Sequence, residues 1–190
     1  MKYRWSLAPN QATLAGFLAG QLNLSPLLAQ CLLNRGLSEA EPITRFLSPR
    51  LQHLADPFLL PDMRGAVARL LTARARREPV TIFGDYDVDG VTATALLTEF
   101  LTALGWEVRH YLPHRMDEGY GLSQTGVENC LELHPTSVLL AVDCGSTAVE
   151  AVRWLRTRGV DVIVLDHHQV SSPSPAAVAL VNPQRATPSE

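Results

Sequence analysis

Three features that are scarce in this chain of 190 residues each exclude a class of protein. The three cysteines, Cys31, Cys130 and Cys144, are odd in number and lack Cys-x-x-Cys spacing, so we expect reduced thiols rather than disulfides or a zinc site. No stretch reaches the roughly 18 consecutive apolar residues of a membrane span, and the segment from Met1 to Ser6 lacks the apolar core of a signal peptide. The sequence therefore predicts a cytoplasmic protein with no membrane partner.

A strong charge of one sign is also absent, since 16 basic residues stand against 19 acidic ones and the net charge is −3. This balance excludes a wholly basic nucleic-acid-binding surface but leaves room for a local cluster. One cluster, residues 74–77, stands at the end of an expected helix, where cations also complement the helix dipole. The other, residues 109–115, includes Arg115, whose guanidinium can hold a phosphate through two nitrogens. Glu118 is an alternative partner that would simply brace Arg115 in its loop.

The most informative segment that is present is Asp85-Tyr86-Asp87-Val88-Asp89-Gly90, in which three carboxylates alternate after an apolar run. Carboxylates this close repel one another, so a cation or a basic group must compensate them. The segment also matches the opening half of an EF-hand calcium loop. That interpretation is disfavoured, because the twelfth position is Leu96 rather than glutamate and the preceding segment is strand-like. A solvated acidic turn remains an alternative for the hexapeptide taken alone.

Residues 1–78 have helical periodicity and predict a small helical lobe. The expected helices cover residues 11–22, 26–34, 38–47 and 61–77. Ser38 and Glu41 have the spacing of a capping box, and Gly36 is placed to end the helix before it. Asp62 is expected to cap the last helix, which would turn Val67, Leu70 and Leu71 inward.

From residue 79 the pattern changes to short apolar runs that alternate with helices. Strands are expected at residues 80–83, 107–111, 138–142, 160–165 and 178–181, with helices at 91–104, 123–133 and 147–158. Continuous apolar strands separated by helices are typical of a parallel sheet with right-handed crossovers and helices on both faces. The prediction is therefore an α/β domain over residues 79–190 with a Rossmann-like three-layer architecture, preceded by the helical lobe.

Polar side chains follow three of these strands where each one ends. Asp85 and Asp87 follow the first strand, Asp143 follows the third, and residues 166–168 (Asp-His-His) follow the fourth. In parallel sheets ligands bind beyond the carboxyl ends of the strands, so these groups should meet at one edge. Carboxylates with imidazoles suit Mn²⁺ or Mg²⁺, and their crowding suggests two ions about 3.5 to 4 Å apart, as in enzymes that hydrolyse phosphate esters.

The three segments resemble motifs I to III of the DHH phosphoesterases. Within that superfamily, the helical lobe and residues 115–122 (Arg-Met-Asp-Glu-Gly-Tyr-Gly-Leu) are similar to RecJ-type exonucleases. The resemblance implies that the metal ligands are Asp85, Asp87, Asp143 and His167, that His168 binds or protonates the phosphate, and that Asp166 orients the imidazoles. It also implies that Arg115 anchors a DNA phosphate beside Tyr120. Asp89 is left with two roles, a further metal ligand or the cap of the following helix.

The resemblance implies a metal-dependent 5′-to-3′ exonuclease acting on single-stranded DNA in repair and recombination, with a single-strand-binding protein and a helicase as partners. Two departures qualify this expectation. Residues 80–84, just upstream of motif I, lack the further histidine ligand that many family members carry there, and the family's fourth aspartate motif and C-terminal domain should come after Glu190. We therefore expect an N-terminal piece with weak or absent activity. The alternatives are a phosphodiesterase for short oligonucleotides or cyclic dinucleotides, and a non-catalytic binding or scaffold module.

Overall fold

The computed structural model describes residues 5–185, which fall into two compact units divided between Ala55 and Asp56. The first unit contains three α-helices and a short 3-10 helix. They are α1 (Ala12–Leu22), α2 (Pro26–Leu33), α3 (Ala40–Leu47) and η1 (Leu51–His53). Its core consists of the buried side chains Ala15, Leu18, Ala19, Ala29, Leu32, Leu33 and Ile43. No single helix in the described part of the chain is long and apolar enough to cross a membrane; α1 and α2, bent by 115° at their junction, meet that criterion only as a pair.

Two of the predicted helix boundaries in this unit have different outcomes. Gly36 adopts φ +81° and follows α2 as predicted, because a positive φ is readily available to glycine. The capping box is wrong. Helix α3 begins at Ala40 with Glu39 at its N-cap position, and no side chain caps it there. Ser38 therefore lies one residue too far from the helix to satisfy its first amide groups.

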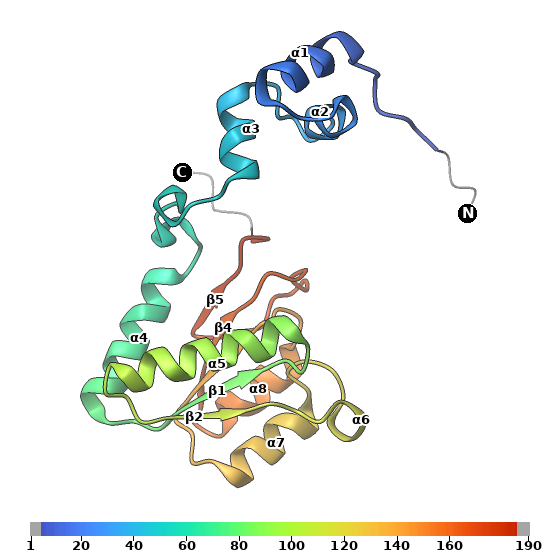
Figure 1. The fold of residues 1–190 in the computed structure, drawn as a ribbon. Helices are drawn as coiled ribbons and strands as arrows, with labels where there is room; N and C mark the ends of the chain where they lie inside the picture. Colours follow the sequence, from blue (N-terminus) through green and yellow to red (C-terminus); the bar gives the residue numbers. More distant parts are fainter. Residues whose placement is uncertain (1–4, 186–190) are drawn as a thin grey trace. The chain divides into compact units, whose positions relative to one another are not determined.

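The second unit is built on a five-stranded parallel sheet with the order β2-β1-β3-β4-β5 (Figure 1). The chain enters it through η2 (Pro57–Leu59) and α4 (Met63–Arg76). It continues through β1 (Val80–Gly84), α5 (Val88–Ala103), β2 (Val108–Tyr111), α6 (Arg115–Glu118), α7 (Gln124–Leu133), β3 (Val138–Val142), α8 (Val149–Thr157), β4 (Asp161–Leu165) and β5 (Ala179–Val181). The predicted α/β class and parallel sheet are confirmed.

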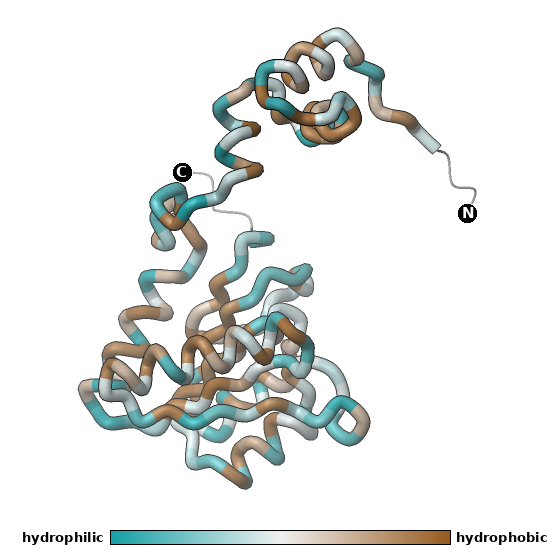
Figure 2. The backbone as a smooth tube through the Cα atoms, viewed as in Figure 1, coloured by the Kyte–Doolittle hydropathy of each residue, from teal (hydrophilic) through white to brown (hydrophobic). Residues whose placement is uncertain are grey.

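Helices cover both faces of the sheet, because successive side chains of each strand point to opposite faces. Ile82 of β1 packs in a core with residues of α4 and α5, whereas Phe83, its neighbour, packs in a second core with residues of α7 and α8. Each of these two side chains is fully buried, which stabilises the fold by about 1.5–3 kcal/mol per residue. Figure 2 shows hydrophobic (brown) segments along the strands and helices of this unit, whereas the loop that carries α6 is mostly hydrophilic (teal). The three-layer arrangement leaves the strand ends free to carry polar groups.

Helix α4 belongs to this second unit, so the spatial division falls earlier than the predicted boundary between residues 78 and 79. Its buried residues are Ala66 and Ala73, whose small side chains let the helix pack closely on the sheet. Of the side chains expected to point inward, Leu70 packs against this core, but Val67 and Leu71 are exposed. The helix is thus rotated relative to the prediction.

The predicted cap of α4 is also wrong. Asp62 occupies the N-cap position with φ +57°, but its side chain makes no capping hydrogen bond. Its carboxylate instead accepts a hydrogen bond from the Leu180 amide (3.1 Å) and forms an ion pair with Arg185. Asp62 therefore ties the start of α4 to β5.

Candidate metal centre

Asp85 follows β1 directly and is fully buried. One carboxylate oxygen, Oδ1, accepts a hydrogen bond from the Tyr86 amide at 2.7 Å, but Oδ2 is buried without a hydrogen-bond partner among residues 5–185. A buried carboxylate oxygen with no donor costs stability, and a cation is the usual way to compensate it.

Asp87 is the N-cap of α5, a role that the sequence analysis left open for Asp89. Its Oδ1 accepts hydrogen bonds from the amides of Asp89 and Gly90, each at 3.0 Å. The Gly90 amide is the main cause that lowers the pKa of Asp87, so the group stays negatively charged. Asp89 lies in the first turn of α5 with an exposed side chain, so the capping role proposed for it is wrong.

Asp143 follows β3 and has a backbone φ of +60°, in the left-handed region that non-glycine residues rarely adopt. Such strain is often found at functional sites. Its side chain is buried, and Oδ2 has no hydrogen-bond partner within residues 5–185. Burial and, after it, the neighbouring Asp87 carboxylate raise the pKa of Asp143. The two acids are therefore close enough to repel each other, in line with the prediction that they meet at one edge of the sheet.

The segment after β4 brings two imidazoles to the same edge. His167 Nε2 lies 3.0 Å from Asp143 Oδ1, and His168 Nδ1 lies 2.8 Å from Asp166 Oδ1. Asp166 was expected to orient both imidazoles, but it contacts only the ring of His168, while the ring of His167 contacts Asp143. The hydrogen bond to Asp166 is the main cause that raises the pKa of His168.

Asp166 is almost fully buried and accepts four hydrogen bonds. Besides the His168 ring, the donors are the amides of Ser146 (3.0 Å), His167 (2.7 Å) and His168 (3.2 Å). Burial alone would raise the pKa of Asp166, but these donors outweigh it and lower the pKa. Asp166 therefore holds the backbone of both histidines and the ring of one.

The donor set fits a divalent cation. Ligand atoms of Asp143, His167 and His168 all lie within 4.8 Å of one another. The buried Oδ2 atoms of Asp85 and Asp143 are further oxygen donors, and no group in residues 5–185 forms a hydrogen bond with them. Oxygen donors with one or two imidazoles suit Mn²⁺ and Mg²⁺. His168, predicted to bind or protonate the phosphate, thus also lies within reach of a metal. A hollow of about 660 Å³ opens here between α5 and the ends of β3 and β4; Asp89, Asp143 and His167 contribute to its lining.

Arg115 lies in the first turn of the short helix α6 and points its guanidinium over the Tyr86 ring, 4.9 Å from the ring centre. Glu118 does not pair with it. The Glu118 carboxylate accepts hydrogen bonds from the Tyr111 hydroxyl, the His114 amide and the Asn129 side chain. Tyr120 contacts Tyr86 edge to face, with ring centres 5.9 Å apart. The arginine is therefore carried beside the acidic segment without a carboxylate partner in the described part of the chain.

Sequence reasoning missed Asn182, which follows β5 and is fully buried. Its amide nitrogen donates hydrogen bonds to Ser146 Oγ (2.7 Å) and to the backbone oxygen of His168 (2.9 Å). Asn182 therefore fixes the loop that carries the histidines. The sequence contains a pattern that could have identified it, because Asn182, like Asp85 and Asp143, is a polar residue placed directly after an apolar strand.

Comparison with known proteins matches the sheet-bearing part of the chain to a family. Residues 79–189 match the model of the DHH family, N-terminal domain. The chain is 34% identical over 184 residues to the single-stranded-DNA-specific exonuclease RecJ of Bacillus subtilis, covering 97% of this chain and 23% of that protein. It is 36% identical over 159 residues to RecJ of Thermus thermophilus, covering 84% and 22%.

Solved structures give the same result for the fold. A crystal structure of exonuclease RecJ bound to manganese superposes with a TM-score of 0.64 at 36% identity, over 72% of this chain and 35% of that one. RecJ from Thermus thermophilus in complex with Mn²⁺ superposes with a TM-score of 0.65 at 31% identity, over 94% and 24%. The chain spans about a quarter of the length of the curated relatives that it matches.

Proposed function

This chain belongs to the DHH family, and from that premise we propose that it is the N-terminal part of a metal-dependent exonuclease that hydrolyses single-stranded DNA from its 5′ end. The observation that carries the proposal is the cluster of Asp143, His167 and His168 after two strands, beside a neighbouring strand whose last residue, Gly84, pairs with Val142 and is followed by Asp85. In residues 5–185 the buried Oδ2 atoms of Asp85 and Asp143 have no hydrogen-bond partner. The relatives named above are single-strand-specific exonucleases, and two of the similar structures hold manganese. Repair and recombination, a cytoplasmic location, and a single-strand-binding protein and a helicase as partners are parts of the same proposal.

In this proposal Asp85, Asp87, Asp143 and His167 hold one or two Mn²⁺ or Mg²⁺ ions. When bound, the metal supplies an activated water and stabilises negative charge on the phosphoryl group. Asp87 contributes a carboxylate ligand from the N-terminus of α5. The backbone amides that donate hydrogen bonds to this carboxylate favour its negative charge. Asp89 is an additional candidate ligand, because it lines the adjoining hollow.

The remaining residues position the DNA. Asp166 accepts from His168 Nδ1 and so leaves Nε2 of the same ring to face a phosphate oxygen or the leaving group. The raised pKa of His168 favours the protonated form, which donates a hydrogen bond to an anion. Arg115, held over Tyr86, binds a second phosphate of the strand through its guanidinium.

We expect residues 1–190 alone to have weak or no nuclease activity, since they span about a quarter of the length of the exonuclease relatives. The test is therefore a chimera in which this chain replaces the matching N-terminal segment of the Bacillus subtilis relative. With Mn²⁺, the chimera should release mononucleotides from the 5′ end of labelled single-stranded DNA, and the same chimera with Asp143→Ala should not.

Two control substrates separate the alternatives. A cyclic dinucleotide and a double-stranded DNA of the same sequence should be cut slowly or not at all. Preference for the cyclic dinucleotide would favour the small-substrate phosphodiesterase, and a chimera that binds single-stranded DNA without cutting it would favour a binding module. Cleavage that survives Asp143→Ala would refute the metal-centre proposal.

A further inference from the structure

The α6 loop, residues 114–120, carries Arg115 beside the acidic segment but is hardly buried itself. Within this loop, Glu118 is the only residue that is not exposed. The residues that border the loop, Pro113 and Leu122, are both buried. Apolar packing therefore anchors the chain on either side of the loop but not the part that carries Arg115. A segment with so few buried contacts opens readily unless polar contacts hold it.

Glu118 supplies such polar contacts. Its carboxylate accepts hydrogen bonds from the Tyr111 hydroxyl, the Asn129 side chain and, at 2.8 Å, the His114 amide. Its backbone oxygen accepts a further hydrogen bond from the hydroxyl of Ser123, which is the N-cap of α7. Hydrogen bonds to an ionised carboxylate are stronger than those between neutral groups. One residue thus ties the loop to β2, which carries Tyr111, and to α7.

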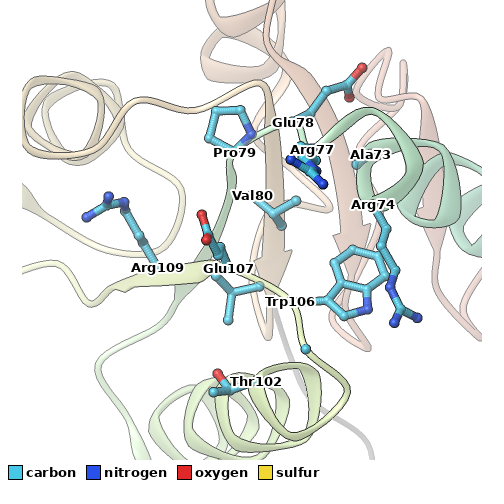
Figure 3. Close-up of a pocket in the computed structure, with 12 residues that line it drawn as sticks. Ala73, Arg74, Arg77, Glu78, Pro79, Val80, Thr102, Trp106, Glu107 and Arg109 are labelled. Carbon is cyan, nitrogen blue, oxygen red and sulfur yellow. The ribbon is translucent and has the colours of Figure 1, made fainter.

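The anchor on β2 is rigid. Tyr111 stacks on Phe83, with ring centres 5.5 Å apart, and packs against the core that α7 and α8 cover. Figure 3 shows Arg109 and Arg74 on opposite sides of Val80, so Arg109 points away from α4. Alternate residues of a strand share a face of the sheet, which places Tyr111 on that same side. Burial and, after it, the hydrogen bond to Glu118 raise the pKa of Tyr111, so its hydroxyl stays a donor.

The place of Arg115 depends on this anchored loop. Arg115 is exposed and lies three residues before Glu118 in α6, with its guanidinium 4.9 Å from the centre of the Tyr86 ring. A cation over an aromatic ring is only weakly attracted at an exposed site. An arginine side chain also loses considerable rotamer freedom when it is fixed. The backbone that Glu118 holds is therefore what keeps this guanidinium beside the acidic segment.

We propose that Glu118 is a positioning residue, whose carboxylate holds the α6 loop so that Arg115 meets a phosphate of the single strand. This rests on the proposed function, because it takes a DNA phosphate as the group that Arg115 binds. The effect on DNA is opposite to that of charge alone. Removing a negative charge near a phosphate-binding surface should strengthen DNA binding, whereas losing the hold on Arg115 should weaken it.

The first test measures the hold on the loop in the full chain, without DNA. Trypsin cleaves after Arg115, and cleavage within a held loop requires local opening. Each rate is divided by that of a peptide of residues 110–124 with the same substitution, which removes the sequence preference of trypsin. Glu118→Ala should raise this ratio by about tenfold or more, since it removes three hydrogen bonds to a charged group. Asp117→Ala is the matched control, because it removes an exposed carboxylate of the same helix. It should change the ratio by less than about twofold.

The second test measures DNA binding by fluorescence anisotropy of 3′-labelled single-stranded DNA. The protein is the chimera described above with Asp143→Ala, so that the strand is not cut. Arg115→Ala and Glu118→Ala should each weaken binding by about tenfold, and the double variant should be no weaker than Arg115→Ala, because Glu118 acts through Arg115. Tyr111→Phe keeps the ring and loses one hydrogen bond, so it should weaken binding by about threefold. Asp117→Ala should bind as tightly as the parent or more tightly.

Two controls separate positioning from a general loss of structure. Circular dichroism checks that each variant is folded, and Tyr111→Phe takes the place of Glu118→Ala in both tests if Glu118→Ala does not fold. Calorimetric titration of the full chain with Mn²⁺ should give the same affinity for Glu118→Ala and wild type, because none of the contacts of Glu118 belongs to the metal centre.

The outcomes distinguish this proposal from the one on which it rests. If Arg115→Ala weakens DNA binding and Glu118→Ala does not, only the role of Glu118 is overturned. It is also overturned if the effects of the two substitutions add in full, or if Glu118→Ala leaves the trypsin ratio unchanged. If Arg115→Ala binds DNA as tightly as the parent, the phosphate contact in the proposed function fails, and the role of Glu118 in DNA binding fails with it.

Discussion

Gly90 is where a single methyl group should disrupt the metal centre. Helix α5 begins so close to the end of β1 that a Cβ at Gly90 would lie 2.4 Å from the Asp85 carbonyl oxygen and 2.5 Å from the Asp85 nitrogen. An ordinary contact is at 3.4 Å or more, so the two segments must separate by about 1 Å, the difference between 3.4 and 2.4. Both atoms belong to the backbone and cannot rotate away. Gly90→Ala therefore displaces Asp85 or the cap formed by Asp87.

The expected cost follows from two opposing effects. Overpacking a tight contact destabilises by about 1–3 kcal/mol, while replacing glycine in a helix returns up to about 1 kcal/mol. We expect the free energy of unfolding of Gly90→Ala to fall by about 1–2 kcal/mol. Gly65→Ala is the matched control, because Gly65 is exposed in α4 and a Cβ there meets nothing within 4 Å. The same substitution should raise stability there by about 0.5–1 kcal/mol.

The assay is urea unfolding followed by circular dichroism, with and without Mn²⁺. A metal at about 100 times its dissociation constant stabilises the folded state by about 2.7 kcal/mol. Wild type and Gly65→Ala should both gain this increment, and Gly90→Ala should lose most of it because its ligands are displaced by about 1 Å. The reasoning is refuted if Gly90→Ala is as stable as wild type and gains the same increment from Mn²⁺.

Three further predictions concern the ionisable groups and the thiols. The pKa of Asp143 is raised, so its negative charge destabilises the folded state increasingly as pH rises above the ordinary value of 3.8. Without metal, Asp143→Asn should therefore be more stable than wild type near neutral pH. Urea unfolding between pH 4 and 7 should show the difference in unfolding free energy growing with pH. Burial would raise the pKa of Glu118, but the hydrogen bonds that its carboxylate accepts outweigh burial and lower the pKa. The charged carboxylate therefore stabilises the fold above pH 4.5, and this stabilisation is lost as pH falls below that value. Glu118→Gln should destabilise the chain at pH 7 and much less in acid. Burial raises the pKa of Cys130 to about 12 and raises that of Cys144 as well, so a thiol reagent at pH 8 should label Cys31 in the folded chain and all three cysteines after unfolding.

Much of the fold could be predicted from the sequence because the strands are buried on both faces. A five-residue apolar run such as β3, bounded by helical segments, has few other ways to satisfy its backbone and side chains. The same logic placed Asp85, Asp143 and His167 at one edge, since the carboxyl ends of parallel strands must meet there. The order of the strands was not predictable, because the apolar pattern of a strand does not specify its neighbours.

The details that failed depend on local dihedral angles and on helix rotation. Whether Asp87 or Asp89 caps α5 is decided by the residue at which the backbone leaves the extended conformation, and that residue is Asp87. The buried face of α4 was misjudged because alanine gives little hydrophobic signal, yet Ala66 and Ala73 are the residues that let the helix approach the sheet. Glu118 accepts a hydrogen bond from Tyr111 instead of pairing with Arg115. This depends on tertiary contacts that the spacing of residues in the sequence does not encode.

The most direct test of the central claim is calorimetric titration of residues 1–190 with Mn²⁺, using wild type, Asp143→Ala and His167→Ala. Glu150→Gln on α8 serves as a control that removes an exposed carboxylate paired with Arg153, outside the metal centre. We expect wild type and the control to bind Mn²⁺ with equal affinity, and the two centre variants to bind at least about tenfold more weakly. Wild type that does not bind Mn²⁺, or Asp143→Ala that binds it as tightly as wild type, would contradict a metal centre at this edge of the sheet.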